Sequence, residues 1–256
     1  MATLKIMSFN MRVDTPADGP NRFIHRKARI KELLDKESPD VIGFQEIKPS
    51  MREWVVETLS DYYAVGVGRG TDCTGEMVLT AFRKDKFALL SADTVMLSTT
   101  PQLFGSRYDG SDQSSCPREY VRVTLKHPDV AEPFSVYNVH TDHIGNIARI
   151  LASSQLLQDI TSRRERMFLL GDFNATPDAP EINMLTACEA RKIKDATASL
   201  GGTFHGFGRT SPVKIDYIFT DEATPVSDAV RIEDTPGEGE PYLSDHNPIY
   251  IIAELG

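Results

Sequence analysis

The sequence predicts an α/β protein in which two packed, mixed β-sheets carry helices on their outer faces. Strand-like apolar runs are too numerous for one simple sheet, and hairpin-like pairs of these runs mix with helical crossovers. Two packed sheets with helices outside is the simplest arrangement that buries elements of both kinds. The 256 residues contain neither a repeat nor an interdomain linker, so we expect one domain that spans residues 1–256.

The first half of the chain alternates strand-like and helix-like segments before a series of strands. Residues 4–10 and 40–46 read as strands. Residues 21–37 between them read as a helix because apolar side chains recur at helical spacing, at Phe23, Ile30 and Leu34. A second helix is expected over residues 50–59. Five strand-like runs follow close together, over residues 62–68, 76–84, 87–97, 120–126 and 134–142.

The second half begins with a pronounced helical pattern over residues 145–163. A strand over residues 166–174 and a short helix over residues 179–187 follow. Three strands are predicted to close the chain, over residues 214–220, 226–233 and 247–255. Two polar segments, residues 105–117 and 234–241, read as loops.

The composition limits the class of protein. Lys and Arg number 28 and Asp and Glu number 37, a net charge of -9. An acidic surface disfavours sequence-independent attraction to nucleic acid, which depends on Lys and Arg, but it leaves room for a local basic groove and suits a metal site of carboxylates. The three cysteines are far apart and form no CxxC, so neither a disulfide framework nor a cysteine zinc site is indicated. The first residues lack the apolar core of a signal peptide and no run approaches membrane-spanning length, so we expect a cytoplasmic protein.

Polar side chains stand at the boundaries of the predicted strands. Six segments bring them there: Asn10, Glu46, His140 with Asp142, Asp172 with Asn174, Asp216, and Asp245 with His246. Each has an ordinary explanation by itself, such as a turn, a solvated carboxylate or a satisfied core histidine. Six together indicate a site, because convergent polar groups on the ends of rigid strands form many binding and catalytic sites.

Five motifs carry a family resemblance: "SFNMR", "GFQE", "LLGDFNATP", "KIDYIF" and "LSDHNPI", in this order. They resemble those of the endonuclease/exonuclease/phosphatase (DNase I-like) superfamily, and the chain is most similar to its small bacterial members. The resemblance covers residues 4–254. It implies a four-layered α/β sandwich and hydrolysis of a phosphoester with Mg²⁺, or Mn²⁺, as cofactor.

The resemblance assigns roles to the strand-end residues. Glu46 resembles the main metal-binding carboxylate, Asn10 the amide that helps hold the metal or the phosphate, and Asp245 a second carboxylate on the metal side. The resemblance also implies five catalytic residues: His140, Asp172, Asn174, Asp216 and His246. Asp172 and Asn174 resemble the pair that orients and deprotonates the attacking water. His246 resembles the histidine at the scissile phosphate, with its tautomer fixed by Asp216, and His140 falls where DNase I also has a histidine.

Substrate contacts are expected from a further group: Arg12, Asp142, His143 and Arg118. Arg12 follows the DNase I pattern where apurinic endonucleases have an aspartate, which argues against a repair role. The loop at residues 105–117, which holds Arg107 and Tyr108, is a candidate substrate contact and equally a plain solvated connection. The predicted partner is a phosphoester substrate, with nucleic acid or a nucleotide among the options. We expect a monomer with no membrane association and no obligate protein partner.

Several alternatives stay open or fail. "HTDH" at residues 140–143 matches half of a metallo-β-lactamase zinc motif, but Asn138 stands where the first half needs histidine. "VGVGRG" at residues 65–70 is not GxGxxG and reads as a turn. A phosphodiesterase is favoured over a phosphomonoesterase acting on a small metabolite or an inositol phosphate. A catalytically inactive binding protein on the same fold is the alternative from another class.

Overall fold

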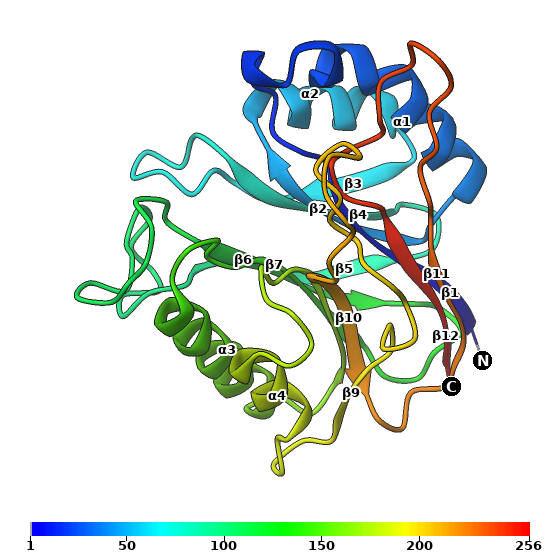
Figure 1. Cartoon of the computed structure of the whole chain (residues 1–256). Coiled ribbons are helices and arrows are strands. Elements are labelled where there is room, and N and C mark those ends of the chain that lie inside the picture. Colours follow the sequence, from blue (N-terminus) through cyan, green and yellow to red (C-terminus); the bar gives the residue numbers. More distant parts are fainter. Residues whose placement is uncertain (1) are drawn as a thin grey trace.

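Two six-stranded β-sheets pack face to face in the computed structural model, which describes residues 2–256 (Figure 1). The first sheet has the strand order β11 (Val226–Arg231), β12 (Ile249–Leu255), β1 (Ala2–Asn10), β2 (Val41–Ile47), β4 (Met77–Arg83), β3 (Tyr62–Val65). The second has the order β5 (Ala88–Met96), β6 (Glu119–Lys126), β7 (Phe134–His140), β8 (Arg166–Asp172), β10 (Asp216–Asp221), β9 (Ile193–Asp195).

The helices lie on the outer faces of the two sheets. α1 (Phe23–Glu37) and α2 (Pro49–Thr58) cover the first sheet, and α3 (Asn146–Thr161) and α4 (Pro180–Thr186) lie beside the second (Figure 1). A short 3-10 helix, η1 (Pro16–Asn21), precedes α1. The predicted four-layered α/β sandwich is therefore confirmed. Among residues 2–256 no helix combines the length and apolar character needed to cross a membrane.

Apolar side chains fill the three interfaces between the four layers. The middle interface, between the sheets, contains Leu4 and Ile6 from β1 facing Phe168 and Leu170 from β8. A second cluster packs Leu156 of α3 on the second sheet, and a third packs α1 and α2 on the first sheet. Burial of apolar area at about 25 cal/mol per Å² makes these interfaces the main favourable contribution to folding.

Strand direction brings the predicted site residues to one end of the sandwich. β1 and β2 are parallel, as are β7 and β8, so each pair ends on the same edge of its sheet. β10 runs antiparallel to β8, and this register places Asp216 directly opposite Asp172. β12 runs antiparallel to β1, so the segment that leads into β12 returns to the end of β1.

Three local features differ from the sequence prediction. The run at residues 62–68 forms a strand only over Tyr62–Val65, because Gly66 takes a φ of 152° where a Cβ would lie 2.3 Å from the carbonyl oxygen of Val78. β10 begins at Asp216 rather than at residue 214, so this carboxylate starts the strand. β9 and η1 were not predicted, since three residues and a Pro-rich turn carry no readable periodicity.

Candidate active site

Asp172 is the central side chain of the polar cluster at the strand ends. Its Oδ2 accepts a hydrogen bond from Asn10 Nδ2 at 2.9 Å, and its Oδ1 accepts one from the backbone N–H of Asn174, also at 2.9 Å. Asn10 Nδ2 also donates to Glu46 Oε1 at 3.1 Å. One amide therefore joins a carboxylate of the first sheet to a carboxylate of the second.

His246 approaches this cluster from the segment before β12. Its Nδ1 lies 2.8 Å from Asp216 Oδ2 and its Nε2 lies 3.8 Å from Asp172 Oδ2. Burial lowers the pKa of His246, but the charge and hydrogen bond of Asp216 outweigh burial and raise that pKa to about 10. Burial, with the charge of Asp216, raises the pKa of Asp172 to about 7. The charged imidazole of His246 therefore faces the buried carboxyl group of Asp172.

Unusual backbone conformations hold several of these side chains. Glu46 has a φ of 62° beside an irregularity between β2 and β4, and Asn174 has a φ of 48°. Gly171 has a φ of 143°, and a Cβ there would lie 1.9 Å from the carbonyl oxygen of Val139. Non-glycine residues at positive φ cost free energy and occur preferentially at functional sites. The "GDFN" segment thus needs glycine directly before Asp172.

Arg12 links the carboxylates on the first-sheet side. Its Nε lies 3.0 Å from Asp18 Oδ2 and 3.6 Å from Asp245 Oδ2, and its Nη1 lies 3.9 Å from Glu46 Oε2. The hydrogen bond with Asp18 raises the pKa of Arg12. The side chain keeps 30% of its surface exposed, so it can still present an N–H to a bound phosphate.

His140 lies on the other side of Asp172. Its Nε2 is 3.6 Å from Asp172 Oδ2, and its Nδ1 is 3.9 Å from Glu76 Oε1, which is in turn 2.8 Å from Arg69 Nη2. Burial lowers the pKa of His140 well below its usual value, and the charge of Arg118 adds to this. His140 is therefore neutral at pH 7, in contrast to His246.

Arg118 and His143 contact each other beside His140, with 2.8 Å between Nη2 and Nδ1. Arg118 is buried, and its Nε and Nη1 have no hydrogen-bond partner among the described residues. Both carboxylate oxygens of Asp142 already accept hydrogen bonds from neighbouring residues. Its Oδ1 accepts the backbone N–H groups of Ile144 and Gly145, and its other oxygen accepts the hydroxyl of Ser114. Asp142 therefore fastens the loop before α3, and a carboxylate would repel a phosphate.

The two side chains expected from the loop at residues 105–117, Tyr108 and Arg107, are held by the protein itself. Tyr108 is buried in the core of the second sheet, where its hydroxyl donates to Gln155 Oε1 at 2.6 Å. Arg107 Nη1 donates to the carbonyl oxygen of Ser114 within the loop. Arg118, directly after the loop, contacts His143.

A family model described as "Endonuclease/Exonuclease/phosphatase family" matches residues 7–246. The chain belongs to this family. The resemblance of the five motifs is thereby confirmed, and the activities in the family's name all cleave phosphoesters. No curated protein sequence matches the chain.

Several solved structures superpose on at least 98% of the chain. A family member from Bacteroides vulgatus is 29% identical, with a TM-score of 0.91 and complete coverage of both chains. The mannosyl-6-phosphatase of Bacteroides thetaiotaomicron is 24% identical, with a TM-score of 0.87 over 98% of this chain and 100% of that one. The catalytic domain of human Nocturnin is 16% identical, with a TM-score of 0.78 over 99% and 95%. The last two show a shared fold.

The endonuclease/exonuclease/phosphatase site has the donors that a hard divalent cation prefers. Ligand atoms of Glu46, His140 and Asp172 lie within 4.8 Å of one another. Carboxylate oxygens suit Mg²⁺, and a cation would offset the charge of two carboxylates that now share one amide. Asn10 Oδ1 accepts the N–H of Arg12 at 2.9 Å, so Asn10 turns its N–H group, not its oxygen, toward the carboxylates. Glu46 and Asp172 would therefore hold the metal, and Asn10 would have to rotate its amide to join them.

Three residues near the site escaped sequence reasoning. Arg69 lies in the "VGVGRG" turn and Glu76 directly before β4, so no strand-end motif marked them. Arg26 of α1 is fully buried and donates to the carbonyl oxygens of Met11, Arg12 and Leu243, which join the end of β1 to the segment before β12. The burial of Arg26 could have been predicted from the sequence, because Arg26 lies three residues after Phe23 on the apolar face of the helix.

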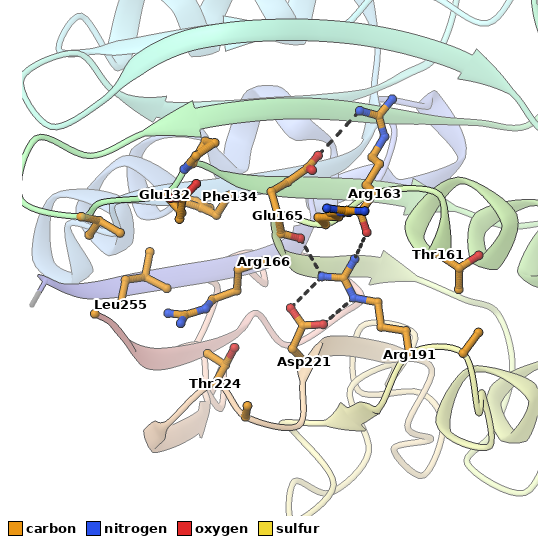
Figure 2. A pocket seen from close by; sticks show the side chains of 16 residues that line it. Glu132, Phe134, Thr161, Arg163, Glu165, Arg166, Arg191, Asp221, Thr224 and Leu255 are labelled. Atoms are coloured by element: carbon orange, nitrogen blue, oxygen red, sulfur yellow. Dashed lines mark hydrogen bonds and ion pairs between the residues drawn. The ribbon is translucent and has the colours of Figure 1, made fainter.

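A cavity of about 790 Å³ lies at the opposite end of the second sheet (Figure 2). Phe134 and Arg166, which line it, begin β7 and β8, whereas His140 and Asp172 end those strands. Figure 2 shows Arg191 held by Asp221 and by carbonyl oxygens. None of its lining residues is a histidine. The histidines and carboxylates of the candidate site lie at the other end of these strands.

Proposed function

We propose that the protein is a divalent-metal-dependent phosphodiesterase that hydrolyses its substrate by attack of water on phosphorus. The observation that carries this proposal is the position of Asp172, which touches Asn10 and Asn174 and lies within 4 Å of two histidines in opposite charge states. Such a set can orient a water molecule, accept its proton and stabilise the charge that develops on phosphorus oxygens.

Asp172 has two roles in the proposed reaction, as proton acceptor and as a ligand of the metal. Asp172, oriented by the N–H of Asn174, accepts the proton of the attacking water. His246, kept charged by Asp216, donates a hydrogen bond to a phosphate oxygen. Glu46, with Asp172, would hold Mg²⁺ or Mn²⁺, and the ion would neutralise the anionic oxygens that repel a nucleophile. Arg12 contributes positive charge at the rim of the site.

A phosphomonoesterase is the second candidate, and one observation favours it. Arg118 contacts His143 through Nη2, its Nε lies 3.6 Å from Asp142 Oδ2, and its buried Nη1 has no hydrogen-bond partner among the described residues. A terminal phosphate carries more negative charge than a diester and would satisfy such donors. The diester stays first because His140 and Arg12 follow the pattern of diester-cleaving relatives. The expectations of a cytoplasmic location and a monomeric state remain predictions.

A substrate panel with Mg²⁺ tests the proposal. It contains bis-p-nitrophenyl phosphate, p-nitrophenyl phosphate, single-stranded DNA, RNA, nucleotides and inositol phosphates. We expect turnover of at least one diester that disappears in Asp172→Asn. Turnover of monoesters with no diester cleaved would make the protein a phosphatase. No turnover of any phosphoester by the folded protein with Mg²⁺ or Mn²⁺ would favour an inactive binding protein.

A further inference from the structure

An open cavity of about 360 Å³ begins at Asn174 and extends between the first turns of α3 and the connection from β8 to α4. Its volume lies in the range of about 300–1,000 Å³ that is usual for small-molecule sites. Asn174 binds Asp172 through its backbone N–H, so the cavity starts beside the proposed reacting centre. The connection that forms one wall is the "NATPDAP" part of the segment that follows β8.

The charged and polar side chains of this cavity are already paired with one another. Arg149 Nε donates to Glu181 Oε1 at 2.5 Å, and Arg149 Nη1 donates to the carbonyl oxygen of Asp142 at 3.1 Å. Both members of the Arg149–Glu181 ion pair are buried. Thr176 Oγ1 donates to Asp178 Oδ1 at 2.6 Å. A second phosphate or other ionic group would find no unpaired charge here.

The remaining walls are apolar, and they continue onto an unusually apolar stretch of surface. Ile150, Ala175, Ala179 and Pro180 line the cavity. On the same segment, Ile144, Ile147 and Leu151 expose 63%, 55% and 38% of their surface. Residues three and four apart share a helix face, so Ile147, Ile150 and Leu151 form one ridge at the solvent side of α3. Isoleucines exposed in a group are characteristic of binding surfaces rather than of a solvated helix face.

We propose that this cavity is a substrate subsite that receives an uncharged, apolar or aryl-sized group esterified to the phosphate. The inference rests on the proposed phosphoesterase function and specifies its substrate class. Asn174 selects the ester group as occupant, because this residue lines the cavity and also binds Asp172, where the phosphate is proposed to react. Paired charges and apolar walls then select a ring or alkyl group over a charged one.

Calorimetric titration in Mg²⁺ with methylphosphonate and phenylphosphonate, at a pH where both are dianions, tests the subsite without any leaving-group effect. The wild-type protein should bind phenylphosphonate about tenfold more tightly or better, because a few buried carbons in an apolar pocket contribute at least that much discrimination. Ile150→Gln should move the affinity ratio toward one. Ile150→Leu, which keeps the wall apolar, should retain the wild-type ratio.

The matched control is Val56→Gln, the same kind of change at an exposed position of α2, which should leave the ratio unaltered. Circular dichroism melting checks that each variant is folded. Equal wild-type affinities for the two phosphonates overturn the subsite but leave the phosphoesterase proposal intact. Failure of both phosphonates to bind, together with no turnover in the substrate panel, overturns both. If Ile150→Gln leaves the ratio of the two phosphonate affinities unchanged, the subsite is overturned. Loss of pelleting on phosphatidylcholine vesicles in that variant then assigns the ridge to a lipid surface, and loss of dimerisation assigns it to a second copy of the chain.

Discussion

His246 stands between two buried carboxyl groups, with its Nδ1 2.8 Å from Asp216 Oδ2 and its Nε2 3.8 Å from Asp172 Oδ2. Asp216 binds the Nδ1 side of the ring, so Nε2 faces Asp172, the proposed base. Because β8 and β10 are paired in register at these two aspartates, the backbone itself sets the separation of Asp172 and Asp216. The geometry makes Asp216 a positioning residue whose effect passes through the histidine.

We expect Asp216→Asn and His246→Ala each to lower kcat on a diester by about 10²–10⁴-fold, the usual contribution of a positioned acid–base group. The double variant should be little worse than the more damaging single variant, because residues that act as a unit give non-additive losses. A double-mutant cycle on kcat measures this. Asp221→Asn, at the other end of the same strand, is the control and should leave kcat near the wild-type value. Losses that multiply would show that the two residues act independently.

Activity should require a divalent hard cation. Glu46→Gln removes one carboxylate oxygen of the candidate metal site, so we expect it to lower kcat at least about a hundredfold and to weaken Mg²⁺ binding in calorimetry, with an unchanged circular dichroism spectrum. Glu53→Gln, at an exposed position of α2, is the matched control. Full activity of the wild-type protein in excess EDTA would refute the metal requirement.

Asp142 should make stability depend on pH in the acid range. Burial raises its pKa, but hydrogen bonds from Gly145, Ser114 and Ile144 outweigh burial and lower that pKa to about 2. A folded-state pKa below the unfolded value near 3.8 means that the stabilisation is complete above about pH 4 and is lost as pH falls through 2. At 1.36 kcal/mol per pKa unit this amounts to about 2 kcal/mol.

The measurement is urea unfolding of the wild-type protein and Asp142→Asn from pH 7 to the lowest pH at which both fold. The difference in unfolding free energy should be constant from pH 7 to about pH 5 and then shrink toward lower pH. Asp112→Asn is a useful comparison because Asp112 accepts the N–H groups of Ile147 and Ala148 at the exposed start of α3. A difference that grows on acidification would contradict the assignment.

Arg26→Met should destabilise the protein by about 3 kcal/mol or more, because the change leaves buried carbonyl oxygens of Met11 and Leu243 without a donor. Lys31→Met on the same helix removes only an exposed ion pair with Asp35 and should cost less than about 1 kcal/mol. Thermal and urea unfolding give both values. Equal stability of the two variants would show that Arg26 is not required to join the end of β1 to the segment before β12.

The sequence by itself determined the fold class and the residues at the strand ends. Apolar periodicity is local, so it located most helices and strands without reference to the rest of the chain. The motifs placed Asp172 and His246 at strand boundaries and Asp216 inside a predicted strand, and the structure brings these three together. The three-residue β9 and the 3-10 helix stayed invisible because they are shorter than any readable repeat.

Tertiary structure alone decided which groups meet. Asn10 and Asp172 are 162 residues apart, and Arg26 contacts a carbonyl oxygen 217 residues away. Tertiary packing also orients the Asn10 amide so that its N–H group faces the carboxylates. It buries Arg118 with no hydrogen-bond acceptor for Nε and Nη1 among the described residues, and it lets Asp142 bind the backbone of the loop before α3. The cavity beside Asn174 exists because α3 and α4 pack together. Such contacts depend on the packing of distant segments, which no local pattern of residues records.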